Sequence, residues 1–320
     1  MIEHAVALDF LSQTGFWIGV GIIAGYYTIF ALGLQLNVGY TGILNFGQAG
    51  FMAVGAYAMG MLVVKAGFSF WLALPVATLI AMAFGLLVGL PSLRLRADYF
   101  AIVTLSFAEI IRIATTNAIS ITGGTEGLPG YTTTWDDTSD SIQESLATIG
   151  WGDEPALPLL LVTALTAVIL IVLLSLAQRT PWGRVLRAIR EDEDAARALG
   201  KNVFSYKLQS LALGAALAAI AGYFLALDLA TLFPDTFEPL FTFIGYAVLI
   251  LGGLASYPGV AAGSVILWAI LEGTRFIELP LVEEKVEALR FMLVGVLIIL
   301  LMVFRPQGMF GKRQEMVLGE

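Results

Sequence analysis

The sequence contains no cysteine and a single histidine, His4, among its 320 residues. The absence of cysteine excludes disulfides, thiolate metal sites and cysteine nucleophiles. His4 stands in an acidic N-terminal stretch, where we interpret it as a solvated residue and not as a ligand or base. The HExxH, GxSxG and GxxxxGK[ST] motifs are missing as well. We therefore expect no metal site, no cofactor and no catalytic residue in this chain, and if ATP drives the protein, another chain must bind it.

Charge is also scarce, because charged residues make up only 13% of the chain and hydrophobic residues 58%. Too few polar side chains remain to cover a soluble globule of this size, so lipid must be the solvent for much of the surface. The first fifteen residues carry Glu3 and Asp9 but no Lys or Arg. They lack the basic region of a secretory signal peptide, and we expect them to be retained.

Long apolar runs fill most of the chain and predict one all-α membrane domain over residues 1–320, a polytopic helical bundle. About nine crossings are expected from the length that a helix needs to span the hydrocarbon core. They fall at 16–36, 41–64, 71–90, 99–117, 158–178, 206–230, 239–255, 257–273 and 288–304. Between 239 and 273, Gly252, Gly253, Pro258 and Gly259 fit a re-entrant turn as well as a full hairpin, and some segments are expected to be broken.

The distribution of Lys and Arg predicts the orientation. Basic residues collect at 94–96, at 179–207 and after residue 304, whereas 118–157 and 231–238 carry acidic residues and no basic ones. We therefore expect a multi-pass protein of the bacterial plasma (inner) membrane, with an external tail (1–15), an external loop (118–157), a cytoplasmic segment (179–205) and a cytoplasmic tail (305–320). The external loop is expected to hold a short helix around 139–149, and either a docking rim or a plain solvated loop fits it.

The charged segment 179–205 is predicted to carry a short amphipathic helix from Trp182 to Leu199 that stops at Gly200. One face of such a helix packs on the bundle, and the other face is one that a separate ATPase subunit can grip. An ordinary basic loop is the alternative. The candidate coupling residues are Arg184, Arg187, Arg190, Glu191, Asp192, Ala195, Ala196, Leu199 and Gly200.

Two stretches place polar residues at membrane depth, where they are costly unless they face protein or water. The first, 39–60, is rich in glycine, which allows close helix packing or a broken helix whose free backbone groups can hold a zwitterion. The second, 99–112, places Glu109 one turn before Arg112, a spacing that also allows an ion pair with a packing role only. The candidate residues of a translocation path are Thr41, Asn45, Gln48, Thr104, Ser106 and Glu109.

Six stretches spread over residues 30–312 resemble, in order, the LivM-type permeases of branched-chain amino acid ABC importers. They are NVGYTGILNFGQAGFMAVGAY (37–57), LRLRADYFAIVTLSFAEIIR (93–112), TGGTEGLPG (122–130), GRVLRAIREDEDAARALGKNVFSYKL (183–208), LILGGLASYPGVAAG (249–263) and FRPQGMFG (304–311). One departure is Asn45 and Gln48, where many relatives show Ser and His.

The resemblance implies a permease subunit that pairs with a LivH-like second permease, two cytoplasmic ATPase subunits and an external substrate-binding protein. It also implies that Gly183–Leu208 couples to the ATPase, which binds the ATP. The expected partners are therefore these proteins, membrane lipid and a small molecule, with no nucleic acid. The expected cargo is branched-chain or other neutral amino acids, with urea or other amides as the alternative.

The expected mechanism is alternating access driven by the separate ATPases. A rival from another class is an ion-coupled secondary transporter with Glu109 as its proton site, which would transport without any partner. A scaffold subunit is a further rival, and the polar residues at membrane depth argue against it.

Overall fold

The structure is a computed structural model that describes most of the chain. The described residues are 13–148, 150–151, 154–276, 288–290, 292, 295–296, 299–300, 303–304 and 308–310. Within them nearly all ordered structure is helical, and two-residue strands β1 (Leu128–Pro129) and β2 (Thr231–Leu232) are the exception. The strands pair antiparallel, with Leu128 opposite Leu232. The predicted all-α class is confirmed.

The helices follow one another along the chain with short connections. In order they are α2 (Thr14–Leu34), η2 (Gln35–Tyr40), α3 (Gln48–Val64), α4 (Phe70–Ser92), α5 (Ala97–Asn117), α6 (Ile119–Thr122), η3 (Gly124–Glu126), α7 (Thr133–Ala147), α8 (Leu157–Ala177), α9 (Pro181–Glu191), α10 (Glu193–Ala198), α11 (Val203–Leu229), η4 (Pro234–Phe237), α12 (Pro239–Gly252), α13 (Tyr257–Gly273) and η5 (Thr274–Phe276). The segment η2 is a π-helix, and the other η segments are short 3₁₀-helices.

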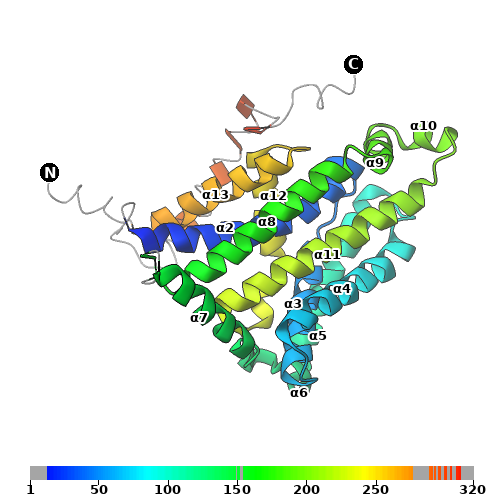
Figure 1. Ribbon diagram of the computed structural model, residues 1–320. Helices are drawn as coiled ribbons and strands as arrows, with labels where there is room; N and C mark the ends of the chain where they lie inside the picture. Colours follow the sequence, from blue (N-terminus) through cyan, green and yellow to red (C-terminus); the bar gives the residue numbers. More distant parts are fainter. Residues whose placement is uncertain are drawn as a thin grey trace.

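The bundle has two ends with different elements (Figure 1). At one end α9 and α10 lie beside the end of η2, where Arg190 donates a hydrogen bond to the Gly39 carbonyl. We call this the α9 end. At the other, the α7 end, Trp135 of α7 packs near Phe70 at the start of α4. The long helices run between these two ends, so each of them carries the chain across the bundle.

The centre of the bundle is α11, which packs against α2, α3 and α4. Small residues make this close packing possible. At Gly55 of α3, an added methyl group would lie 2.4 Å from the Cα atom of Ala219 in α11. At Gly222, it would lie 2.4 Å from the Met52 carbonyl oxygen. The glycines on this face are therefore required by helix contact.

Among the described residues, five helices are long and apolar enough to cross a membrane, or six if the bent pair α12–α13 counts as one span. The five are 14–40, 70–92, 97–117, 157–177 and 203–229. These agree with the predicted segments 16–36, 71–90, 99–117, 158–178 and 206–230. Of the remaining predicted segments, 288–304 lies largely outside the described residues, as do most of the tails 1–15 and 305–320. The number of about nine crossings therefore stays a prediction.

The predicted continuous segment 41–64 is wrong in its first part. The helix α3 begins at Gln48 and has only 17 residues, and residues 42–47 are not helical. Gly42 adopts a φ of +75°, a left-handed conformation that glycine tolerates and other residues rarely adopt. A non-helical segment is tolerated at this depth because other groups of the protein form hydrogen bonds with its backbone.

The segment 239–273 is one sharply bent pair and not two full crossings. The axes of α12 and α13 differ by 114° at the break. A helix of 14 residues, the length of α12, extends only about 21 Å, which is short of the roughly 30 Å hydrocarbon core. The glycines and proline of this segment left two arrangements open, a re-entrant turn and a full hairpin. The structure shows the broken or re-entrant arrangement.

Two predicted short helices differ in their bounds. The loop predicted to be external forms α7 over 133–147, earlier in the chain than the expected 139–149. The expected helix 182–199 is divided into α9 and α10 at Asp192, whose carboxylate accepts hydrogen bonds from the backbone N–H groups of Asp194 and Ala195. Such a side chain caps a new helix, which is why the first one ends there. Gly200, with a φ of +77°, does end the segment as predicted.

Candidate functional site

The site of interest is the break between α2 and α3, where the chain leaves the π-helical turn η2 and enters the non-helical residues 42–47. Ile43, Asn45 and Gly47 of the break are buried, whereas Gly42 and Leu44 are exposed. Gly47 lies so close to α5 that an added methyl group would come within 2.3 Å of the Thr104 carbonyl oxygen. Because π-helical turns and broken helices are frequent at functional sites of membrane proteins, this break is the natural candidate.

Four of the six predicted path residues gather at this break, and all four are fully buried: Thr41, Asn45, Gln48 and Thr104. Asn45 donates from Nδ2 to the Gln48 side-chain oxygen (2.9 Å), and Gln48 donates from Nε2 to the Gly214 carbonyl (3.0 Å). Thr104 accepts a hydrogen bond from the Phe46 backbone N–H (3.1 Å). These side chains therefore satisfy the irregular backbone and fix it against α5 and α11.

A second layer of polar side chains completes the network, and residue-by-residue analysis of the sequence did not select it. The Ser210 hydroxyl of α11 lies 2.8 Å from the Thr41 hydroxyl and donates to the Asn37 side-chain oxygen (3.2 Å). Thr242 of α12 accepts from the Ala49 backbone N–H (3.1 Å). Ser210 and Thr242 are fully buried, as Asn45 is. Each is a polar residue in an otherwise apolar segment of the sequence, and this was the signal that would have identified them.

The turn between α12 and α13 lies against η2. The Gln35 side-chain oxygen accepts from the backbone N–H groups of Ala255 and Ser256 (2.5 and 2.6 Å), in the amide orientation that pairs donors with acceptors. The Tyr40 hydroxyl donates to the Ala255 carbonyl (2.6 Å), and the Tyr40 ring stacks on Tyr257. Tyr246 of α12 donates to the Asn45 carbonyl (2.9 Å). The π-helical turn, the break and the bent pair thus form one hydrogen-bonded unit.

The other two predicted path residues lie elsewhere, on the outer face of α5. Ser106 is exposed and points away from Thr104, since residues two apart on a helix face different sides. Glu109 forms the predicted ion pair with Arg112 (2.6 Å), and Arg112 also binds Asp235 of η4 (2.7 Å). The Glu109 carboxylate is therefore held by a neighbouring guanidinium, and Arg112 joins α5 to the segment after α11.

The outer face of α5 is less apolar than that of α8. Its most apolar window has a mean hydropathy of 1.4, against 3.0 for α8, yet both helices bury little of their surface in this chain. Ser106 and Glu109 lie on α5 among the exposed side chains of Ile102, Ile110 and Ile113, whereas the exposed face of α8 is made of Leu, Ile, Val and Ala. The exposed face of α8 fits lipid, whereas the polar groups on that of α5 are costly in lipid and favour a protein or aqueous neighbour at their positions.

The predicted coupling residues are presented by α9 and α10 at the α9 end (Figure 1). Ala196 is buried and packs with Ile189 and Val203, so it anchors α10 to the bundle. Arg184, Glu191, Asp192, Ala195, Leu199 and Gly200 are exposed. Leu199 is the extreme case, since it is 80% exposed at the end of α10. The structure thus separates the predicted set into an inner anchor and an outer surface.

Two arginines of α9 connect this surface to the interior. Arg187 donates to the Gln178 carbonyl at the end of α8 (3.1 Å). Arg190 donates to the Gly39 carbonyl in η2 (2.5 Å), and its carbons lie beside Gly42. A carbonyl at the end of a helix has no intrahelical partner, and a guanidinium satisfies it well. Arg190 therefore joins α9 directly to the π-helical turn.

Comparison with known proteins gives a consistent result. A family model described as the permease component of the branched-chain amino acid transport system matches residues 18–302. The chain is 34% identical to the high-affinity branched-chain amino acid transport system permease protein LivM of Escherichia coli (strain K12), over 97% of this chain and 73% of that protein. It is 27% identical to the probable LivM permease of Methanocaldococcus jannaschii, over 96% and 95%, and 28% identical to the probable LivH permease of that organism, over 78% and 77%. No solved structure matches the chain.

Proposed function

Since the chain belongs to the family of branched-chain amino acid transport permease components, we propose that it is the membrane-spanning subunit of an ATP-driven importer that works by alternating access. The chain supplies the conduit, and separate subunits bind and hydrolyse ATP. The proposed cargo is a branched-chain or other neutral amino acid. Urea or another amide is the alternative cargo, because a soluble binding protein would make most of the selection.

The observation that carries this proposal is the contact between Arg190 and the Gly39 carbonyl. It joins α9, the proposed ATPase-coupling helix, to the π-helical turn. The π-helical turn holds Ala255 and Ser256 through Gln35 and Tyr40. A displacement of α9 is therefore passed to the break in the chain and to the bent pair α12–α13 through hydrogen bonds alone. Differential contact of this kind is what a ligand-driven change of state requires.

The proposed orientation places the α9 end in the cytoplasm and the α7 end outside, because Lys and Arg gather at the former and acidic residues at the latter. The termini follow from it, with the N-terminus outside and the C-terminus inside. Two ATPase subunits would then bind the exposed surface of α9 and α10, and an external binding protein would dock at the α7 end. No partner in this scheme is a nucleic acid.

A second, LivH-like permease is proposed to cover the outer face of α5. The support is the low hydropathy of α5, its exposed Ser106 and the half-exposed Glu109 beside it. Phe46 of the break and Phe243 of α12 pack against each other, and Phe243 is half-exposed. Placing the second subunit here would give the path two walls, one of them built on the break that Thr41, Asn45, Gln48 and Thr104 hold in place.

The ion-coupled rival receives less support from the same residues. A proton site needs a carboxylate whose charge can be lost at working pH, but Glu109 is paired with Arg112, which also binds Asp235. A role for Glu109 in positioning Arg112, which joins α5 to η4, fits these contacts better.

The test is replacement of Arg190 by Glu in the transporter reconstituted with its partner subunits, with leucine as the probe. Losing a charge-assisted hydrogen bond and placing a carboxylate against the Gly39 carbonyl should reduce uptake about tenfold or more. ATP hydrolysis and membrane insertion should remain, so more ATP is consumed per leucine imported. The double variant with Arg187→Glu should show the same uncoupling more strongly.

The matched control is Lys201→Glu, which makes the same change of charge on an exposed residue of the same segment. It should leave the ratio of ATP hydrolysed to leucine imported unchanged. If Arg190→Glu also leaves this ratio unchanged, α9 does not transmit through η2. If the chain alone, reconstituted without partners, accumulates leucine in response to an ion gradient, the ATP-driven function itself is wrong.

A further inference from the structure

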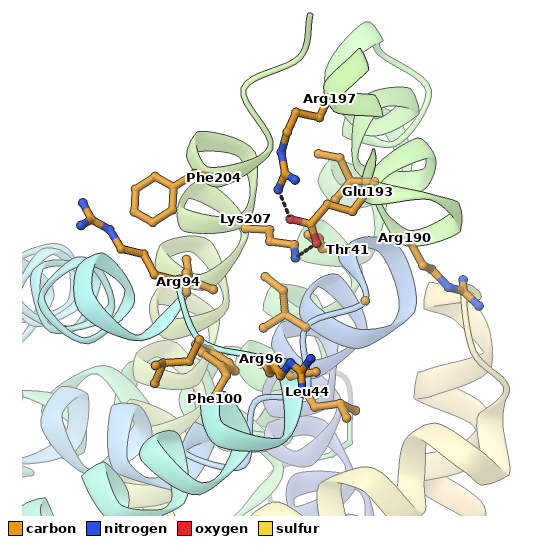
Figure 2. Close-up of a pocket in the computed structure, with 16 residues that line it drawn as sticks. Thr41, Leu44, Arg94, Arg96, Phe100, Arg190, Glu193, Arg197, Phe204 and Lys207 are labelled. Carbon is orange, nitrogen blue, oxygen red and sulfur yellow. Dashed lines mark hydrogen bonds and ion pairs between the residues drawn. The ribbon is translucent and has the colours of Figure 1, made fainter. Parts of the chain in front are cut away.

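A pocket at the α9 end lies beside the coupling helix and shares Thr41 and Arg190 with the network described above (Figure 2). It is a cavity of about 520 Å³, a size typical of small-molecule sites. Its walls come from four parts of the chain: the break after Thr41, the α4–α5 connection, α9–α10 and the start of α11. The pocket is therefore built by the tertiary structure.

The pocket is strongly basic in a chain that is acidic as a whole. Five cationic side chains and one carboxylate line it: Arg94, Arg96, Arg190, Arg197, Lys207 and Glu193. The formal net charge of the whole chain, by contrast, is −8. So many cations around one concave site raise the local concentration of anions. The bound group that this lining fits is an anion.

The cations do not all serve the same purpose (Figure 2). Arg94 turns outward and lies over the Phe204 ring at 5.8 Å, and Arg190 turns away to the Gly39 carbonyl. Lys207 and Arg197 share Glu193, and Arg197 also pairs with Asp194 (3.0 Å). Arg197 is therefore largely neutralised by its two carboxylates, whereas Lys207 has the one partner Glu193 in the described structure and retains N–H donors for an added anion.

Arg96 is the cation that the fold leaves unengaged. It is exposed, and within the described part of the chain it has neither an ion pair nor a side-chain hydrogen bond. It is also the N-cap residue of α5, a 21-residue helix whose first turn lacks a side-chain cap among the described residues. The next residue, Ala97, lines the pocket. Free N–H groups at a helix N-terminus add to the attraction that Arg96 and Lys207 exert on an anion.

The position of the pocket favours a lipid as the source of that anion. It lies at the ends of three membrane-length helices, after α4 and before α5 and α11, which is where the headgroups of a bilayer are. Leu44 and Leu95 line it and are exposed, and Tyr99 on the next turn is exposed too. Basic pockets between spanning helices on the cytoplasmic side are typical sites for anionic headgroups, and Tyr is typical of the interface.

We propose that this pocket binds a phosphate group, with Arg96 and Lys207 as its principal ligands, and that the group is the headgroup phosphate of an anionic lipid or a free phosphate ion. Leu44, Leu95 and Tyr99 border the side from which an acyl chain would leave. Because the break and α9 both contribute to the pocket wall, an anion bound in it would lie against both elements.

The test uses the full chain purified in detergent together with the subunits that copurify with it. Phosphatidylglycerol and phosphatidylcholine with identical acyl chains are titrated and counted by native mass spectrometry, and inorganic phosphate is added separately in thermal unfolding. The double variant Arg96→Gln/Lys207→Gln should bind phosphatidylglycerol about thirtyfold more weakly, and each single variant about fivefold more weakly. Phosphatidylcholine should bind wild type and variants alike.

The matched controls are Arg179→Gln and Lys201→Gln, which remove the same two charges from exposed positions of the neighbouring segment outside the pocket. Both should bind phosphatidylglycerol as wild type does. A lipid source predicts that phosphatidylglycerol alone is affected by the variants. A free-ion source predicts that inorganic phosphate stabilises wild type but not the double variant.

The proposal is overturned if the double variant binds both probes like wild type. It is also overturned if the double variant keeps its lipid but no longer copurifies with an ATPase subunit, because the pocket then receives an acidic protein segment. If the double variant does not fold, the two single variants decide the question by the same measurements. Binding in detergent depends on neither transport nor orientation, so this result is independent of the proposed function.

Discussion

At the scale of single residues, the polar side chains inside this bundle serve the backbone first. Asn45, Gln48 and Thr104 are each engaged with another part of the break, α5 or α11. Asn37 is an exception near the break, because its Nδ2 atom is buried and lacks a partner among the described residues, as do Thr163 Oγ1 and Trp268 Nε1 elsewhere in the bundle. The Asn37 side-chain oxygen, by contrast, accepts from Ser210.

Glycine residues at helix contacts give a sharp test at the same scale. Gly55→Ala would place a methyl group 2.4 Å from Ala219. The clash is with backbone, which cannot move aside, so we expect the free energy of unfolding to fall by about 1–3 kcal/mol. The measurement is thermal unfolding of the purified protein.

The control for this change is Gly19→Ala in α2, where an added methyl group would meet no atom of the described structure within 4 Å. Alanine favours helix over glycine by up to about 1 kcal/mol, so this variant should be as stable as wild type or more so. Equal destabilisation by both variants would mean that α3 and α11 are not in contact as described.

At the scale of elements, the α9–α10 segment works as two short helices with a corner at Asp192. Leu186, Ile189 and Ala196 are buried under the corner, while Leu199 stands out at 80% exposure. A buried anchor and an exposed apolar tip are what a rigid docking element needs. The corner keeps the tip away from the bundle, where a partner can reach it.

The cap at this corner is open to direct measurement. Asp192→Ala removes the acceptor for two backbone N–H groups of α10, which costs about 1 kcal/mol at a typical N-cap. Hydrogen exchange of the amides in 193–199 should therefore become about fivefold faster. Asp194→Ala, which removes only an exposed ion pair with Arg197, should leave this exchange rate nearly unchanged. Equal rates in wild type and Asp192→Ala would show that the cap does not hold α10.

The bent pair α12–α13 is the second element joined to the break. Its turn is held by Gln35 and Tyr40, and its first helix reaches the break through Thr242 and Tyr246. The bent pair therefore contacts η2, which Arg190 holds, and also the break that follows η2. Movement of η2 has to move the pair as well, since no loop intervenes.

At the scale of the whole molecule, the two ends of the bundle differ in charge, and the fold keeps them apart. The basic residues of the α4–α5 connection and of α9–α10 meet in one pocket, whereas Asp136, Asp137, Asp140 and Glu144 lie on α7 at the other end. The five membrane-length helices run between them. The positive-inside rule then orients the molecule as a unit.

The absence of native cysteine makes this orientation easy to test. Leu199→Cys and Ser141→Cys place single thiols on exposed positions at the two ends. A membrane-impermeant maleimide should label Ser141→Cys in intact cells, and Leu199→Cys only after the membrane is opened. The unsubstituted chain is the control and should not be labelled. The reverse pattern would place α9 outside, where no ATPase can reach it.

The amino-acid sequence by itself determined the class of the protein, most of its crossings and its charged ends. Those features depend on composition and on runs of about 20 apolar residues, and both can be counted along the sequence without knowledge of the fold. It also indicated the Glu109–Arg112 pair and the stop at Gly200, because both are set by spacing within one helix. The division of 182–199 at Asp192 was missed although the capping residue was present, since the apolar spacing continues across it.

Only the tertiary structure decided where the polar residues point and which segments meet. Thr104 and Ser106 are two residues apart, yet one is buried against the break and the other is exposed on the outer face of α5. Arg190 and Gly39, or Arg96 and Lys207, are far apart in the chain, and no periodicity relates them. Their meeting depends on how helices pack, which is set by the close approach of small residues such as Gly55 and Ala219. Packing of this kind is a property of pairs of surfaces, and a single segment does not contain it.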